Sequence, residues 1–192
     1  MARYSGSRVK IIRRLGLLPG FTTKAIKKSS KFLNSKRLSQ YGLHLQEKQK
    51  LRYNYGVSEH ELIKYVQKSR KKRGDTGNIL LQLLESRLDS TVYRAGFAPT
   101  IIAARQLINH GHVSVNKKKV TIPGFHCGIG TQISMKKSTL KTPLELKNTE
   151  SQWFSIIEKN EDIFIVKTNE PNIQLLGFSI NILMVLEYYS GK

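Results

Sequence analysis

The spacing of apolar residues changes along the chain and separates helical segments from strands. Apolar positions recur with a helical period after the capping sequence Ser58-Glu59-His60-Glu61, where Ser and Glu three residues apart predict a helix start. Gly111 predicts the end of a later helix. Ser179 is a possible N-cap for a final helix over 180–189. The residues from Ile182 to Leu186 could equally form a strand by propensity alone. Helices are therefore predicted over 59–73, 76–93, 100–109 and 180–189.

From Val113 onward the apolar period is two, as in strands with one buried face. The turn sequence Asn116-Lys117-Lys118 separates Val113 and Val115 from Val120 and Ile122, which predicts a hairpin with one apolar face. The apolar segments at 133–135, 153–157 and 163–166 predict three further strands. A small antiparallel sheet therefore follows the first helices.

The net charge of the chain indicates what kind of partner it binds. The 192 residues include 33 Lys and Arg against 13 Asp and Glu, a formal net charge of +20. Residues 1–73 carry 20 of the cations and three Glu, so their net charge is +17, and the rest of the chain has +3. Such an excess predicts a polyanionic partner, and nucleic acid is preferred over an acidic membrane because neutralised phosphates release counterions. A hydrophobic fraction of 39% is enough to bury a core.

The N-terminal segment is the most basic part of the chain. Apolar residues before Leu43 are too sparse for a core, so residues 1–45 are expected to form an extended arm that becomes ordered on its partner. An acid-free start with Arg and Ser is also typical of a transit peptide, but no cleavable small-residue site precedes Gly16-Leu17-Leu18-Pro19-Gly20. The single Cys127 excludes an internal disulfide, and no apolar run approaches the roughly 18 residues that span a membrane. A soluble intracellular protein is expected.

Residues 87–133 carry the candidate chemistry, in the order helix, turn, helix and hairpin. Arg105 and Asn109 are four residues apart and share one helix face, so this helix should present a stripe of hydrogen-bonding groups. Asn116 and the lysines that follow it place donors at the hairpin tip. A helix edge beside a basic tip can follow a bent RNA backbone and recognise its shape and phosphates.

The same stretch resembles the RNA-binding module of the small-subunit ribosomal protein four family. The resemblance rests on Arg87-Leu88-Asp89, Tyr93-Arg94-Ala95-Gly96-Phe97-Ala98, residues 104–112, Val115-Asn116 and Ile122-Pro123. Outside the module, residues 8–20 resemble the plastid-type N-terminus of the family, and residues 40–42, 47–52, 55–56, 77–85, 180–181 and 187–190 match further segments. The chain departs from the family at Lys117, where glycine is usual, and at Thr131, where an acidic residue is usual.

This resemblance implies an α+β fold, in which a helical domain from N- and C-terminal segments carries an inserted RNA-binding module of two helices and a small antiparallel sheet. The implied division is a basic arm over 1–45, a helical domain over 46–86 completed by 177–192, and the module over 87–176. A structural constituent of the small ribosomal subunit is implied, with no enzyme activity and no cofactor. It would bind small-subunit rRNA at a five-way junction early in assembly.

The resemblance also implies neighbours in the ribosome. These are small-subunit ribosomal protein five and mRNA near its entrance channel, with a role in translational accuracy and with neither DNA nor a membrane as partner. The N-terminal resemblance, together with a preference for Lys over Arg and frequent Ile and Asn, favours a plastid (chloroplast) ribosome. The bacterial cytoplasm is the alternative.

The candidate RNA contacts are basic, amide and imidazole side chains. Before the module they are Arg3, Arg8, Lys10, Arg13, Arg14, Lys50, Arg52, Lys68, Arg70, Lys71, Lys72 and Arg73. Within it they are Arg87, Arg94, Arg105, Gln106, Asn109, His110, His112, Asn116, Lys117 and Lys118. Arg94, Arg105 and Asn109 are expected to contribute most per residue, because Arg and amide groups bind directionally and arm lysines act as point charges.

Each signal also has a simpler explanation. The cations from Lys68 to Arg73 favour the dipole at a helix end, although five cations in six residues exceed that need. Tyr53, Tyr55 and Tyr65 could stack on bases, but aromatic residues at helical spacing more often belong to a core. A metal site is suggested by His110, His112, His126 and Cys127, but these four side chains lack the paired spacing of a structural zinc site, so no metal is expected.

Two other classes of protein, an RNA-modifying enzyme and a DNA regulator, fit the sequence less well. An RNA-modifying enzyme such as a pseudouridine synthase often carries a similar module, but this chain leaves no segment for a separate catalytic domain and shows no nucleophile motif. A helix-turn-helix DNA regulator would place its second helix in a major groove, whereas here the second helix leads into a hairpin and no dimerisation signal is present. RNA binding is the preferred prediction.

Overall fold

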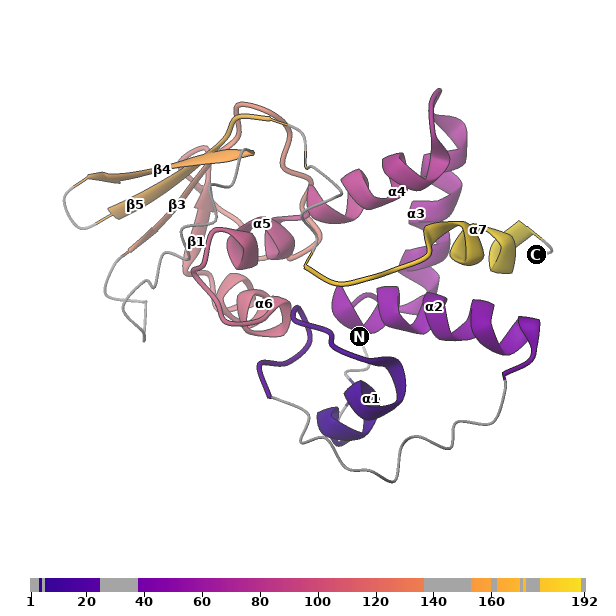
Figure 1. The fold of residues 1–192 in the computed structure, drawn as a ribbon. Helices are drawn as coiled ribbons and strands as arrows, with labels where there is room; N and C mark the ends of the chain where they lie inside the picture. The colour runs from indigo at the N-terminus through magenta and orange to yellow at the C-terminus, as the bar shows by residue number, and fades with distance from the viewer. Residues whose placement is uncertain are drawn as a thin grey trace.

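The computed structural model describes residue 4 and residues 6–24, 38–136, 153–159, 162–169, 171 and 177–190. Within these ranges the chain forms seven helices and one five-stranded antiparallel sheet, so the predicted α+β fold is confirmed (Figure 1). None of the helices in the described ranges is long and apolar enough to cross a membrane. The elements are α1 (Arg8–Leu15), α2 (Gln40–Asn54), α3 (Glu59–Lys71), α4 (Thr76–Glu85), α5 (Leu88–Arg94), α6 (Ile101–Asn109), β1 (Val113–Val115), β2 (Lys118–Lys119), β3 (Gln132–Lys136), β4 (Phe154–Lys159), β5 (Asp162–Lys167) and α7 (Ile182–Ser190).

Helices α2, α3, α4 and α7 form the helical part of the molecule. Their buried faces meet in one apolar cluster that includes Leu51, Leu62, Leu80 and Val185. The predicted capping box at Ser58 is present, which explains why α3 begins where the sequence predicts. Although α7 is last in the sequence, it packs beside α2 (Figure 1). The N-cap contact of α7 comes from Asn181, whose side chain accepts a hydrogen bond from the Met184 amide, and not from the predicted Ser179.

The carboxylate of Glu59 in α3, which is hydrogen-bonded to side chains of α2 and α7, should make the stability of the fold depend on pH. The Glu59 carboxylate accepts hydrogen bonds from Lys48 Nζ at 3.0 Å and the Tyr189 hydroxyl at 2.7 Å. Burial raises the pKa of Glu59, but these two donors more than offset it, so the pKa lies below its ordinary value of 4.5. The folded state therefore binds fewer protons than the unfolded state, and this stabilisation is present above pH 4.5 and lost as the pH falls through the folded pKa.

We expect Glu59→Gln to flatten the fall of the thermal unfolding midpoint between pH 5 and pH 3, roughly the range in which a carboxylate with a lowered pKa titrates. Tyr189→Phe should flatten it partly, because loss of the hydroxyl donor returns the pKa of Glu59 toward its ordinary value. An unchanged acid dependence in both variants would show that Glu59 does not contribute.

The sheet and α5 and α6 form the second part of the molecule. The strand order is β2-β1-β3-β5-β4, and every neighbouring pair is antiparallel. Alternate residues such as Val115, Ile133 and Ile165 lie opposite one another across the strands and are buried with apolar residues of α5 and α6. The predicted strands over 133–135, 153–157 and 163–166 are confirmed, as is the helix over 100–109, capped by Thr100.

The single helix predicted over 76–93 is wrong, because the chain leaves the helix at Ser86 and Arg87. The Ser86 carbonyl accepts a hydrogen bond from the Cys127 amide at 2.7 Å, and Arg87 forms an isolated β-bridge with His126. These bonds to a distant segment replace helical ones, and α5 starts with a new direction after Arg87. The apolar pattern continues through the break because both helices bury leucines, so spacing alone could not reveal it.

The extended arm predicted over 1–45 is wrong for residues 8–22, and also for residues 40–45, which belong to α2. Residues 8–15 form α1, and Ile12, Leu15, Leu18 and Phe21 are buried in a cluster of their own. Gly20 fixes this segment, since its amide donates to Asn54 Oδ1 at 3.0 Å and its carbonyl accepts from the Ile101 amide at 2.8 Å. The few apolar residues suffice because they pack onto α2 and α6. Residues 1–3, 5 and 25–37 of the predicted arm lie outside the described residues.

The hairpin is shorter than predicted. Its second strand, β2, contains only two residues, and Ile122 is 64% exposed, so it does not belong to the apolar face. The turn residues Asn116 and Lys117 both have positive φ, 49° and 66°, as a two-residue hairpin turn of the primed type requires. Lys117 therefore occupies a conformation that glycine adopts without steric cost.

We expect Lys117→Gly to stabilise the fold by about 0.5–1 kcal/mol, because a left-handed conformation costs an L residue ~1–2 kcal/mol and the added flexibility of unfolded glycine offsets only part of that. Urea unfolding measures the change. The control is Lys118→Gly in β2, which removes the same charge but should destabilise by about 0.5–1 kcal/mol. A loss of stability in both variants would contradict the argument.

Candidate nucleic-acid interface

Helix α1 presents one cationic face and one apolar face. Ile12 and Leu15 are buried, whereas the predicted contacts Arg8, Lys10, Arg13 and Arg14 are exposed. None of these four forms an ion pair with an acidic residue in the part of the chain that the structure describes, although the Arg8 guanidinium lies 5.8 Å from the Phe21 ring centroid. Predicted Arg3 lies outside the described residues.

The end of α3 carries the densest group of cations. Ser69 is buried and its hydroxyl donates to the Val66 carbonyl at 2.8 Å, which anchors the last turn. The five predicted contacts around it are exposed and form no ion pair with any described acidic residue; they are Lys68, Arg70, Lys71, Lys72 and Arg73. We call these five side chains the α3 cation cluster.

The end of α6 and the tip of the hairpin lie next to each other, as the sequence predicts. The side chain of Lys119 lies against Gly111, which follows α6, and the rings of His110 and His112 stack with centroids 6.1 Å apart. Lys119 is one of the lysines that the sequence places as donors in the hairpin, and it is exposed. The other predicted contacts in this group are exposed too: Gln106, Asn109, Asn116, Lys117 and Lys118.

The three arginines of the module point inward. Arg87 is 2% exposed, and its guanidinium donates to both oxygens of Asp89 at 3.0 and 2.8 Å, so the prediction that it contacts RNA is wrong. Arg94 donates twice to Glu85, and Arg105 donates to the Gly56 carbonyl. The side chains of Arg94 and Arg105 are only 17% and 18% exposed. Their charge is therefore largely used within the protein.

Two predicted contacts on α2 are engaged in local interactions. Lys50 forms an ion pair with Glu47 at 2.5 Å, and its side chain is 18% exposed. Arg52 is half-buried, lies 5.2 Å from the Tyr53 ring centroid and donates to Gln49 at 3.4 Å. Both would have to give up these contacts to bind a phosphate.

The tyrosines belong to the fold. Tyr55 is buried and its hydroxyl donates to Glu85 at 2.6 Å, and the Tyr65 hydroxyl accepts from Arg87 at 2.8 Å. Tyr53 packs against Phe21 with ring centroids 5.5 Å apart. His126 is exposed at the surface.

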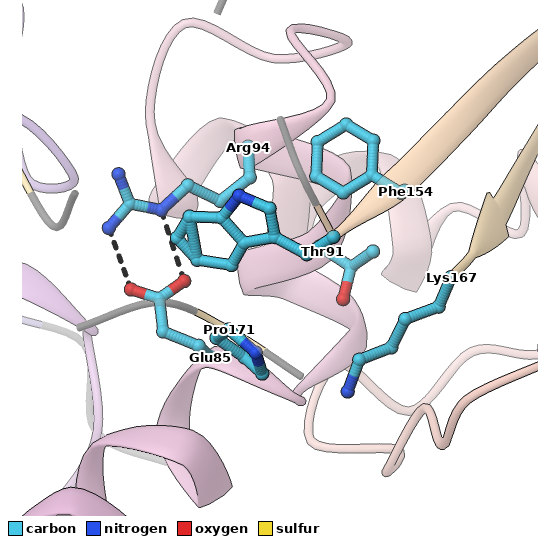
Figure 2. A pocket seen from close by; sticks show the side chains of 7 residues that line it. Glu85, Thr91, Arg94, Phe154, Lys167 and Pro171 are labelled. Atoms are coloured by element: carbon cyan, nitrogen blue, oxygen red, sulfur yellow. Dashed lines mark hydrogen bonds and ion pairs between the residues drawn. The ribbon is translucent and has the colours of Figure 1, made fainter. Parts of the chain in front are cut away.

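A small pocket lies between the helical part and the sheet. Figure 2 shows the Glu85 carboxylate paired with the Arg94 guanidinium at one end and Lys167 at the other. Trp153 also lines the pocket. Lys167 Nζ donates to Ser86 Oγ at 2.9 Å and to the Cys127 carbonyl at 3.0 Å, so it holds two segments together. No three His, Cys, Asp or Glu side chains gather as metal ligands in the described ranges. The charged side chains of the pocket are therefore already engaged within the protein, Glu85 and Arg94 with each other and Lys167 with neutral acceptors.

Comparison with known proteins extends over the whole chain. The S4 domain family matches residues 86–133, and the ribosomal protein S4/S9 N-terminal domain family matches residues 3–85. A Bigelowiella natans protein named small ribosomal subunit protein uS4c is 61% identical over 196 residues, covering 100% of both chains. The protein of the same name from Chaetosphaeridium globosum is 47% identical over 205 residues, and uS4c-1 from Cyanidium caldarium is 45% identical over 203, each covering 100% of both chains.

Proposed function

The chain belongs to the ribosomal protein S4 family, in its plastid form, and we propose that it binds rRNA through three exposed cationic regions. These regions are α1, the α3 cation cluster, and the end of α6 with the hairpin tip. The protein is a structural constituent of the small ribosomal subunit with an S4 RNA-binding domain, and its relatives are named as ribosomal proteins and not as enzymes.

One observation carries the proposal: the cations of these regions are exposed and form no ion pair with an acidic residue within the described ranges. A cation that is already paired with an acidic residue gains little free energy from contact with a phosphate. A cation without such a partner neutralises the phosphate and releases a counterion from the RNA. Amide and imidazole groups at the end of α6 add directional hydrogen bonds to backbone or base edges. The combination suits a folded RNA whose phosphates converge from several helices.

Finer aspects of the function rest on the family resemblance. We propose that the protein organises a multi-helix junction of the small-subunit rRNA early in assembly. Small-subunit ribosomal protein five and mRNA near its entrance channel would be its neighbours, with an effect on translational accuracy. We also propose the division into a helical domain over 46–86 completed by 177–192 and an inserted module over 87–176, with residues 8–22 packed against both.

Sedimentation of the native plastid extract tests the proposal. The protein, followed by antibody, should migrate with the small subunit and remain there after a moderate salt wash. Migration as a free 21.9 kDa species would overturn the proposal. Hydroxyl-radical footprinting of the purified rRNA, with and without the protein, should then show protection at several helices that meet in one junction. Protection of a single isolated hairpin would contradict the junction role.

A further inference from the structure

The three arginines of the module share one property: each donates to an acceptor in the helical part of the molecule. Arg94, at the end of α5, donates to both oxygens of Glu85 at 3.0 and 2.7 Å. Arg87, before α5, donates to the Tyr65 hydroxyl of α3 at 2.8 Å. Arg105, on α6, donates to the Gly56 carbonyl that follows α2. The acceptors thus come from α3, α4 and the segment that follows α2.

The acceptors are themselves held in place. Glu85 is 4% exposed and also accepts from the Tyr55 hydroxyl at 2.6 Å, so its carboxylate is fixed between the two parts of the molecule. Asp89 holds Arg87 from the other side and lies 3.8 Å from Arg105 Nε, which links two of the three arginines. A guanidinium is a rigid planar fork, so paired hydrogen bonds to it fix direction as well as distance.

Apolar contacts across the same boundary are few. Tyr93 packs against the clusters of both parts, and Ile101 of α6 is buried in the helical cluster. Apolar burial is non-directional, so these contacts can hold the two parts together without fixing the angle between them. Directional hydrogen bonds can fix this angle, and those of the arginines act beside the pair that Gly20 makes with Asn54 and the Ile101 amide.

We infer that Arg87, Arg94 and Arg105 are positioning residues that set the angle between the module and the helical part. The inference rests on the proposed rRNA binding, because the α3 cation cluster lies on one side of this joint and the hairpin tip on the other. If the angle is fixed, binding of one cationic region to an RNA holds the other region close to its own phosphates, so the second contact forms at a high effective concentration. If the angle varies, this effective concentration falls. The arginines thus determine specificity for a folded site without touching it.

Substitution of the acceptors separates this role from direct RNA contact, because the two roles predict opposite changes in RNA affinity. Glu85→Gln removes the negative charge that pairs with Arg94, so direct contact of Arg94 with RNA predicts equal or tighter RNA binding. A positioning role predicts that affinity for the junction RNA falls about 10-fold while affinity for a short generic RNA duplex stays unchanged. Tyr65→Phe, which removes only the acceptor of Arg87, should act in the same direction and serves if Glu85→Gln fails to fold. The matched control is Glu187→Gln, an exposed acid on α7 far from the joint.

A distance measurement reports on the joint itself. Spin labels at Gln67→Cys on α3 and Thr121→Cys beyond β2 span the two parts, and both positions are exposed. Buried Cys127 should not compete for the label, because burial raises the pKa of its thiol to about 12. We expect a narrow distance distribution in the parent and a broad one after Glu85→Gln or Tyr65→Phe. A distribution that stays narrow with unchanged junction affinity would overturn the inference, whereas failure of the parent to bind junction RNA would overturn the proposed function instead.

Discussion

Replacing the α3 cation cluster by glutamines is expected to lower the affinity for junction RNA by about 10²–10³-fold at roughly 0.15 M salt. The variant changes Lys68, Arg70, Lys71, Lys72 and Arg73 together. Because the five side chains leave the helix end in different directions, we expect three or four to reach phosphates at once. The slope of log affinity against log salt should therefore fall by about three units, near 0.9 per lost contact. Filter binding over a salt series measures both quantities.

Lys50→Gln is the matched single control, because Lys50 is already paired with Glu47 and should change the slope by less than about one unit. Helix-dipole stabilisation is the competing explanation for these cations. It predicts a loss of up to about 1 kcal/mol in the free energy of unfolding and no change in the salt slope. An unaltered slope in the five-residue variant would therefore remove the α3 cation cluster from the RNA interface.

Asp89→Ala is expected to lower the free energy of unfolding by about 3–5 kcal/mol, the cost of leaving one member of a buried ion pair without its partner. Both residues are buried, with Arg87 2% and Asp89 0% exposed. Burial lowers the pKa of Arg87, but the adjacent Asp89 more than offsets this and raises the pKa further above its ordinary value, so the guanidinium stays charged at any accessible pH. A guanidinium keeps its proton at neutral pH even without an acidic partner, so deprotonation of Arg87 cannot relieve the loss of Asp89. Urea unfolding monitored by circular dichroism measures the change.

The double variant Arg87→Met with Asp89→Leu should be considerably more stable than Asp89→Ala alone, because apolar replacement of both partners leaves no buried charge. Glu187→Gln, which neutralises an exposed carboxylate 3.0 Å from His44 Nε2, should change the free energy of unfolding by at most about 1 kcal/mol. If Asp89→Ala behaved like this surface control, the Arg87–Asp89 pair would be open to water in solution.

The sequence by itself determined the features that depend on neighbouring residues. Helical period, the capping box at Ser58 and the Thr100 cap are local, so α3 and α6 begin where the pattern predicts. Alternation of apolar residues identified β3, β4 and β5 because one face of each strand must be buried. The family resemblance and the charge of +20 need only composition and residue order.

Tertiary structure decided where each arginine points and where each segment packs. Arg87, Arg94 and Arg105 have the same residue type as the exposed Arg70 and Arg73. Only the presence of Asp89, Glu85 and the Gly56 carbonyl beside them turns them inward. The break between α4 and α5 and the docking of residues 8–22 likewise depend on partners from distant parts of the chain. Local spacing contains no information about which surfaces meet, and a buried ion pair or hydrogen bond exists only where they do.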